Sequence, residues 1–338
     1  MPRHLAGIAV AGSCKCPDTE NTPILLTRLA AHPKMNLVVI FATQLQLDMR
    51  RIAFQLAVII ASATTICSAQ ESPFFVTYTH HMEEPGNLEV ETTTTTGIPR
   101  SGQRFYTAPY LELEYGVTAQ WTSELYLESS SVWGDSTVFT GWRFENRYKP
   151  FNREHWINPV LYLEYESVNE ASRIQKEIEG GGPDLTSSNR ELRGEHAHEL
   201  ESKLILSSDF RDWNISENFI ATKNLSESEG VEFGYAFGVS RPLATLASGE
   251  NCRLCRENFI AGVEMYGGLG STLGFSPHGS AHYIAPVVSW AIGDNSSLRF
   301  STGFGLTDQS NPVLIRFGYS YELAGFGSKV SRLFGGKR

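Results

Sequence analysis

Residues 107–115 read Thr-Ala-Pro-Tyr-Leu-Glu-Leu-Glu-Tyr and alternate apolar with polar side chains. Residues 123–129, Ser-Glu-Leu-Tyr-Leu-Glu-Ser, repeat the alternation after a short connection. Successive side chains of a β-strand point to opposite faces of its sheet, so a period of two predicts strands with one apolar and one polar face. The two stretches therefore predict neighbouring strands of an all-β fold.

Runs of this kind recur along the chain with turn signals between them. Twelve strands are predicted, over 88–97, 107–115, 123–129, 138–148, 158–168, 198–209, 213–224, 231–241, 257–268, 281–292, 296–307 and 311–323. Strands of about 10–12 residues suit a tilted crossing of a bilayer. The connections on one side are mostly short, with 241–256 as the exception, and the longest loop, 169–197, falls on the other side. This pattern is typical of a closed antiparallel transmembrane β-barrel.

The two faces of the predicted strands differ in chemistry. One face is rich in leucine and aromatic residues, including Leu111, Leu161 and Phe300, as a lipid-facing band must be. The other face carries twelve acidic and five basic side chains, which we predict to line the lumen. These candidates are Glu112, Glu114, Glu124, Glu128, Arg143, Glu145, Arg147, Glu164, Glu166, Glu199, Glu201, Lys203, Glu232, Glu264, Arg299, Arg316 and Glu322.

Two interpretations of the charged face remain open. Burying so many charges in a dry interior is costly, and a water-filled lumen would avoid that cost. Its excess negative charge would then raise the local concentration of cations. Alternatively, the charges pair across neighbouring strands and fill the barrel, because twelve strands enclose only a modest lumen.

Composition agrees with this fold class. The 338 residues include 28 basic and 37 acidic side chains, for a net charge of -9, which argues against a general nucleic-acid binder. With 41% hydrophobic residues the chain is not disordered, and five cysteines are too few for a disulfide-built miniprotein. The sequence contains no stretch of about 20 unbroken apolar residues, which excludes a polytopic helical membrane protein.

The start of the chain carries an export signal. Met49-Arg-Arg is followed by an apolar run over 52–61 and small residues up to Ala69, which predicts a signal peptide over 49–69. We expect translation to begin at Met49, with 1–48 an upstream extension; the alternative is a long, atypical signal region from Met1 or Met35. Residues 70–87 then form a lead-in, 88–323 the barrel and 324–338 a C-terminal tail.

Three stretches carry a resemblance to a known family. The first is His-Glu-Leu-Glu-Ser-Lys-Leu-Ile-Leu-Ser-Ser-Asp-Phe at 198–210, with Trp213-Asn214 after it. The others are Tyr-Leu-Glu-Leu-Glu-Tyr-Gly-Val-Thr at 110–118 and Gly-Phe-Gly-Leu-Thr-Asp at 303–308. Over about 85–323 the chain resembles the outer-membrane, porin-like family described as putative MetA-pathway of phenol degradation. The resemblance implies an outer-membrane barrel that takes up small, aromatic or apolar molecules. It brings no catalytic residues. Barrels of this class often end on an aromatic residue, whereas here a tail follows Leu323.

Cysteine and histidine motifs are candidates for disulfide and metal sites. Cys252-Arg-Leu-Cys255 predicts a local disulfide in the 241–256 connection, because an oxidising envelope favours it and no second C-x-x-C completes a zinc site. His196 and His198 share one face of a strand and are weak metal candidates; the alternative is an exposed polar start to that strand. His80 and His81 are adjacent, so a strand would point them to opposite faces.

These observations predict an outer-membrane barrel that is a passive channel or transporter for small solutes with an acidic lumen, in the bacterial (Gram-negative) outer membrane. We expect outer-membrane lipid and an unidentified small-molecule solute as partners, and no nucleic acid, cofactor or catalytic residue. One alternative is a barrel enzyme acting on lipid, although the sequence lacks Gly-x-Ser-x-Gly. The other is a secreted, soluble β-sandwich that binds a ligand.

Overall fold

The computed structural model describes residues 72–100, 103–174, 176–178, 184–244 and 254–334. They belong to one compact unit, 69–338. The predicted extension 1–48 and signal peptide 49–69 lie outside the described residues. No helix within the described ranges is long and apolar enough to cross a membrane.

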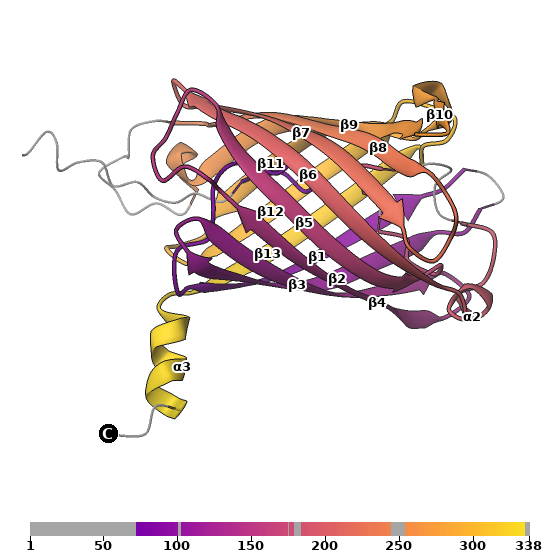
Figure 1. Cartoon of the computed structure of the whole chain (residues 1–338), viewed down its shortest axis with the longest axis horizontal. Helices are drawn as coiled ribbons and strands as arrows, with labels where there is room; N and C mark the ends of the chain where they lie inside the picture. Colours follow the sequence, from indigo (N-terminus) through magenta and orange to yellow (C-terminus); the bar gives the residue numbers. More distant parts are fainter. Residues whose placement is uncertain (1–71, 101–102, 175, 179–183, 245–253, 335–338) are drawn as a thin grey trace, which may run out of the picture. The chain divides into compact units, whose positions relative to one another are not determined.

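One sheet of twelve long antiparallel strands closes on itself in the described part of the chain (Figure 1). Each strand pairs with the next, and β13 pairs with β1 along its whole length, from Leu88 opposite Leu323 to Ile98 opposite Val313. The predicted closed barrel is thereby confirmed, and the alternative of a β-sandwich is not favoured. The strands are β1 (Leu88–Ile98), β2 (Tyr106–Thr118), β3 (Trp121–Val132), β4 (Thr137–Tyr148), β5 (Asn158–Asn169), β6 (His196–Phe210), β7 (Trp213–Asn224), β8 (Val231–Pro242), β9 (Phe259–Ser271), β11 (His282–Ala291), β12 (Ser296–Gly305) and β13 (Val313–Leu323).

The two ends of the barrel differ. At the end where β1 begins and β13 ends, called the terminal end below, most strands are joined by short turns; Arg211 and Asp212, both at positive φ, form the turn between β6 and β7. At the opposite end, called the loop end, β5 and β6 are joined by the long 170–195 connection, which holds α2 (Asn189–Leu192). Strand β10 (Gly274–Phe275) extends the sheet beyond β9 at the same end. The short 3-10 helices η1 (Arg256–Asn258) and η2 (Pro277–Gly279) precede β9 and β11.

The outer surface of the barrel is apolar. Every second side chain of the strands points outward, so leucine and phenylalanine side chains remain exposed in the middle of strands: Leu163 is 50% and Phe300 46% exposed. Exposed apolar surface on this scale is typical of a face that contacts lipid or another protein, and a lipid-facing band is the arrangement of outer-membrane barrels. The intervening side chains point inward and are largely buried, as the burial pattern of β3 illustrates.

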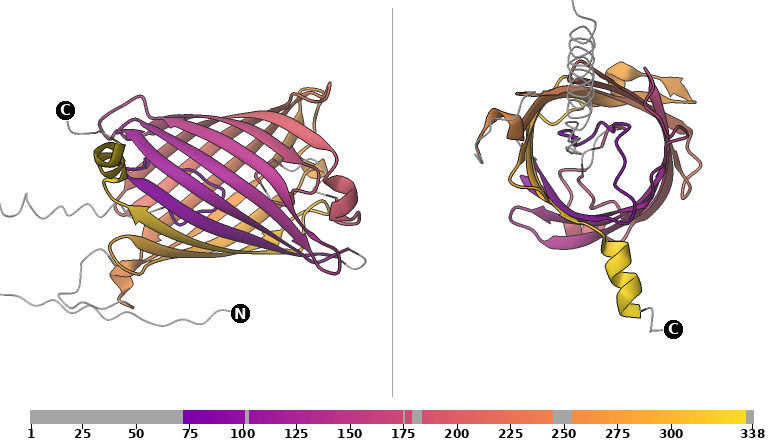
Figure 2. Two further views of the ribbon diagram at one scale, coloured as in Figure 1. Left: turned by 90° about the horizontal axis from the view of Figure 1, so that it is seen from below. Right: turned by 90° about the vertical axis from the view of Figure 1, so that its left-hand side faces the viewer.

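A helix that the sequence analysis did not predict follows the barrel. Helix α3 (Phe326–Phe334) leaves the terminal end outside the ring of strands (Figure 2). The Phe326 ring packs edge-on against Tyr115 with the centroids 6.4 Å apart, and the Gly327 N–H donates to the Gly86 carbonyl at 2.9 Å. Nine residues with glycine among them give too short a periodic signal to predict a helix from sequence.

Candidate functional site

The charged face predicted to line the lumen points inward. Of its seventeen residues, twelve are buried and the other five, Glu114, Glu199, Glu232, Arg299 and Glu322, are half-buried. The inward positions of β3, β4 and β5 lie side by side, so opposite charges on these strands meet. These side chains form the wall of the candidate site.

Two arginines of β4 bind most of the glutamates in this part of the wall. Arg143 pairs with Glu128 and also with Glu164, whose Oε2 lies 3.0 Å from Nη1. Arg147 donates from Nε to Glu124 Oε1 at 2.7 Å and from Nη2 to Glu114 Oε1 at 2.5 Å. Each guanidinium thus bridges carboxylates of two strands, since its planar fork offers several donors.

Residues 72–82, called the inserted segment below, run through the lumen from the terminal end (Figure 2). They form no strand, so their backbone groups need side-chain partners. The Glu264 carboxylate of β9 accepts the N–H groups of Phe75 at 3.4 Å, Val76 at 3.0 Å and Thr77 at 3.0 Å. The Glu264 carboxylate therefore accepts the backbone N–H groups that the carbonyls of a neighbouring strand would accept in a sheet.

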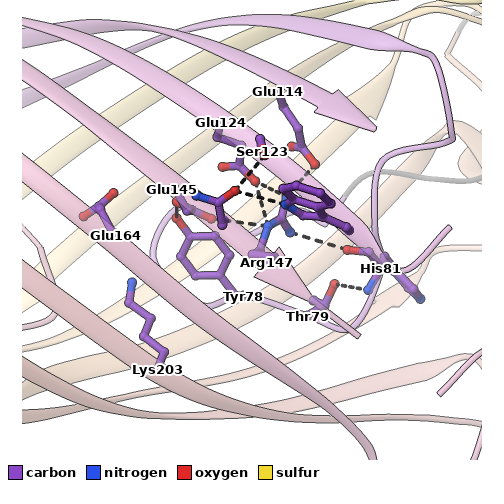
Figure 3. A network of polar contacts seen from close by, with 12 residues as sticks. Tyr78, Thr79, His81, Glu114, Ser123, Glu124, Glu145, Arg147, Glu164 and Lys203 are labelled. Atoms are coloured by element: carbon purple, nitrogen blue, oxygen red, sulfur yellow. Dashed lines mark hydrogen bonds and ion pairs between the residues drawn. The ribbon is translucent and has the colours of Figure 1, made fainter. Parts of the chain in front are cut away.

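Tyr78 is held by its backbone and by its side chain. The Asn218 amide accepts the Tyr78 N–H at 2.7 Å and donates to the Tyr78 carbonyl at 2.9 Å. The Tyr78 hydroxyl donates to Glu145 Oε2 at 2.8 Å, beside the Arg147 network (Figure 3), and the Lys203 ammonium lies 4.5 Å from its ring centroid. Burial and the nearby carboxylates of Glu145 and Glu124 raise the pKa of Tyr78 well above its usual value. The phenol thus stays a neutral hydrogen-bond donor.

Small inward residues make room for the inserted segment. A Cβ atom at Gly238 would approach the Phe74 ring to 2.7 Å, and one at Gly262 would approach it to 3.2 Å. Phe74 is 2% exposed, and its carbonyl accepts a hydrogen bond from Arg299 at 2.7 Å. Val76 packs with Tyr266 and other apolar side chains of the wall. Apolar and polar contacts therefore both hold the segment inside the barrel.

The connection between β5 and β6 enters the lumen from the loop end. Lys176 pairs with Glu166, Glu177 pairs with Lys203, and Ile178 packs against the apolar cluster that contains Val76. Burial lowers the pKa of Lys176, but the Glu166 carboxylate raises it more, so its pKa lies above the usual value. The described residues of this connection, 171–174 and 176–178, thus fold inward.

The inserted segment and the β5–β6 connection therefore occupy part of the lumen, and several of its charges are paired, as in the second of the two interpretations. Acid still exceeds base: eleven glutamates and five arginine or lysine side chains are buried among the described residues. Glu89, Glu91, Arg173 and Glu177 of this set were not among the residues predicted from the sequence. Glu91 lies in the predicted strand 88–97, where it alternates with uncharged neighbours as the identified residues do. This alternation could have predicted that its side chain points inward.

Three groups of described residues bring three potential metal ligands within 4.8 Å of one another. Glu112, Glu114 and Glu124 form one, and Arg147 already pairs with Glu114 and Glu124. A second glutamate group, around Glu201, contacts Lys203 and other cations of the wall. The third group contains two histidines and is described below.

The predicted histidine pair lies outside the lumen. His196 and His198 are exposed, and His198 Nδ1 is hydrogen-bonded to the Tyr165 hydroxyl at 3.0 Å. No third ligand within the described ranges is close enough to share an ion with both. Cys255 is disulfide-bonded. Its predicted partner, Cys252, lies outside the described residues, so the pairing stays a prediction.

The fold is similar to that of solved barrels at low sequence identity. The structure titled KdgM porin is 8% identical, with a TM-score of 0.45, covering 69% of this chain and 98% of that chain. The NanC porin is 12% identical, with a TM-score of 0.43 over 70% of this chain and 100% of that chain. The CymD monoaromatic hydrocarbon channel is 9% identical, with a TM-score of 0.38 over 72% of this chain and 89% of that chain. At these values the likeness concerns the fold alone.

Sequence comparison identifies no family. No known protein family matches the chain, and no curated protein is significantly similar to it. The class that the structure defines is a closed antiparallel β-barrel, with twelve long strands in the described part of the chain. The finer family that the sequence resembles is not confirmed.

Proposed function

We propose that the protein is a channel for small solutes in the bacterial outer membrane, and that the inserted segment and the inner part of the β5–β6 connection hold it closed. The observation that carries this proposal is the kind of contact that keeps the inserted segment in place. Glu264 and Asn218 bind it through backbone groups by hydrogen bonds. Water can replace such bonds, so the segment can leave without unfolding the barrel wall.

The apolar outer band supports the membrane location, since it would be costly to expose to water. The acidic excess of the wall supports a preference for cationic or neutral solutes once the lumen is open. The resemblance to the phenol-degradation family points to small aromatic molecules within that range. We propose no catalytic role and no cofactor for this chain.

Ion selectivity in planar bilayers tests the channel and its acidic wall together. Across a salt gradient, the wild-type protein should show brief openings with a cation-selective reversal potential. Glu112→Gln with Glu114→Gln should move that potential toward zero, because two carboxylates leave the wall.

Glu227→Gln with Glu229→Gln is the matched control, since it removes two exposed acids outside the barrel wall. This pair should keep the wild-type selectivity. An equal loss in both pairs would contradict the lumen assignment, and absence of any conductance in the wild type and in variants that free the inserted segment would refute the channel.

A further inference from the structure

A cluster of histidines and carboxylates lies at the terminal end of the barrel, where the inserted segment leaves the lumen. His80 and His81 belong to the segment, Glu154 to the β4–β5 turn and Asp209 to the end of β6. His80 Nε2 lies 2.8 Å from Glu154 Oε2 and 3.7 Å from Asp209 Oδ2. His81 Nε2 lies 2.9 Å from Asp209 Oδ2. Three elements distant in sequence thus bring four potential ligands together.

The donor set and its spacing suit a divalent transition-metal ion. One ligand atom each from His80, His81 and Asp209 lie within 4.8 Å of one another. Ligands at about 2.0–2.1 Å from a tetrahedral zinc ion are roughly 3.3 Å apart. A small decrease in the distances between these ligand atoms would therefore bring them to the spacing of a zinc coordination shell. Two imidazoles with carboxylates are typical ligands of Zn²⁺ and similar ions, whereas Ca²⁺ and Mg²⁺ prefer all-oxygen sites.

The bonding of His80 is an independent indication of a missing partner. Its side chain is 1% exposed, yet Nε2 has no hydrogen-bond partner within the described part of the chain. Glu154 Oε2, 2.8 Å away, forms an ion pair with this ring only when the imidazole is protonated. The other ring nitrogen, Nδ1, is 2.8 Å from the Ser207 hydroxyl. A histidine whose second nitrogen is held by a hydrogen bond is oriented as metal-ligating histidines are.

The carboxylate partner is oriented as well. Asn214 donates from Nδ2 to Asp209 Oδ1 at 2.7 Å, which leaves Oδ2 directed at the histidines. Such bonds to the far atom of a ligand fix its position before an ion arrives. Adjacent residues of a strand would face opposite ways, but the inserted segment is not a strand. The rings of His80 and His81 therefore lie together, with centroids 4.5 Å apart, and share Asp209 as a neighbour.

We propose that His80, His81 and Asp209, with Glu154 as the fourth ligand, bind one Zn²⁺-type transition-metal ion that fastens the inserted segment to the barrel wall. The ion crosslinks the segment to the end of β6 and to the β4–β5 turn. The existence of this site does not depend on the channel function. If the channel function also holds, the metal keeps the segment inside the lumen.

Metal binding to the full-length protein in detergent tests the proposal directly. Zn²⁺ bound at equilibrium dialysis is compared between the wild type and His81→Gln with Asp209→Asn. Both residues are about half exposed, so the double variant should fold, which a mobility shift on boiling confirms. His196→Gln with His198→Gln is the matched control, because it removes two histidines elsewhere on the barrel.

The wild type and the control should bind one more equivalent of Zn²⁺ than the site variant, or bind it at least about tenfold more tightly. Co²⁺ in place of Zn²⁺ should show visible tetrahedral absorption bands that the site variant lacks. Equal Zn²⁺ binding and equal Co²⁺ spectra in all three folded proteins would overturn the proposal and leave the histidines as ion-pair partners of the carboxylates only.

Discussion

Glu264→Ala removes the carboxylate that accepts the N–H groups of Phe75, Val76 and Thr77 inside the barrel. Alanine keeps the β-strand and the adjacent glycine contacts of β9, so the barrel wall should survive. The inserted segment loses its main anchor on that side. We expect the variant to open the lumen far more often than the wild type.

The size of the effect follows from the geometry. Two of the three hydrogen bonds are 3.0 Å long, and the third, at 3.4 Å, is weak. A hydrogen bond to a charged group contributes about 1.5–3 kcal/mol. Taking the lower value for the two shorter bonds, because water will solvate the released N–H groups, gives about 3 kcal/mol. That is a change of about 100-fold in the closed-to-open ratio, so an open state populated at about 0.1% rises to about 10%.

Single-channel recording measures this population as the open probability. Glu232→Ala is the matched control: Glu232 is a half-buried glutamate near the loop end of the neighbouring strand β8 and makes no hydrogen bond to the described inserted segment. A folded Glu264→Ala barrel whose open probability equals that of the wild type and of Glu232→Ala would refute the reasoning, since the carboxylate would then not hold a gate.

Two further predictions concern the wall itself. Leu163→Arg places a charge on the outer surface in the middle of β5, where Leu163 is 50% exposed. Urea titration in vesicles should show a free energy of unfolding that is lower by about 2–4 kcal/mol. An unchanged midpoint would mean that this surface does not face lipid. Lys203→Met leaves the buried Glu177 and Glu201 without their shared cation and should cost about 3–5 kcal/mol in the same titration. A loss below about 1 kcal/mol would show that water or protons already neutralise these carboxylates.

The barrel could be predicted from the sequence because its signal is local. Leu111 and Glu112 are adjacent, yet Leu111 is exposed and Glu112 is buried. The period of two of a β-strand accounts for this difference, because successive side chains point to opposite faces. Closing twelve such strands then follows from the even count and the contrast between short turns and one long loop. The same period predicts which strand residues point inward, although Glu89 and Glu91 of β1 were not identified.

The contents of the lumen could not be predicted in this way. The run Phe74-Phe75-Val76-Thr77-Tyr78 has no alternation, and its partners lie on strands far along the chain. Which partner it meets depends on the tilt and stagger of the closed barrel, which no local pattern encodes. The inward glycines at 238 and 262 were the available signal: small residues on a lumen face leave space that another segment fills.

The balance between the wall and its contents gives the proposed gate its two states. Phe74 and Ile178 place apolar surface against the wall, and that burial favours the closed barrel. Acidic side chains outnumber basic ones in the wall. This excess of negative charge favours the open, hydrated lumen, because carboxylates in excess over the cations are more stable in water than in a dry interior. A permanently filled barrel would gain stability by replacing such glutamates with apolar residues, so their presence favours a lumen that also exists in a hydrated state. A metal ion at His80 and His81 would bias the same equilibrium toward the closed side without altering the wall.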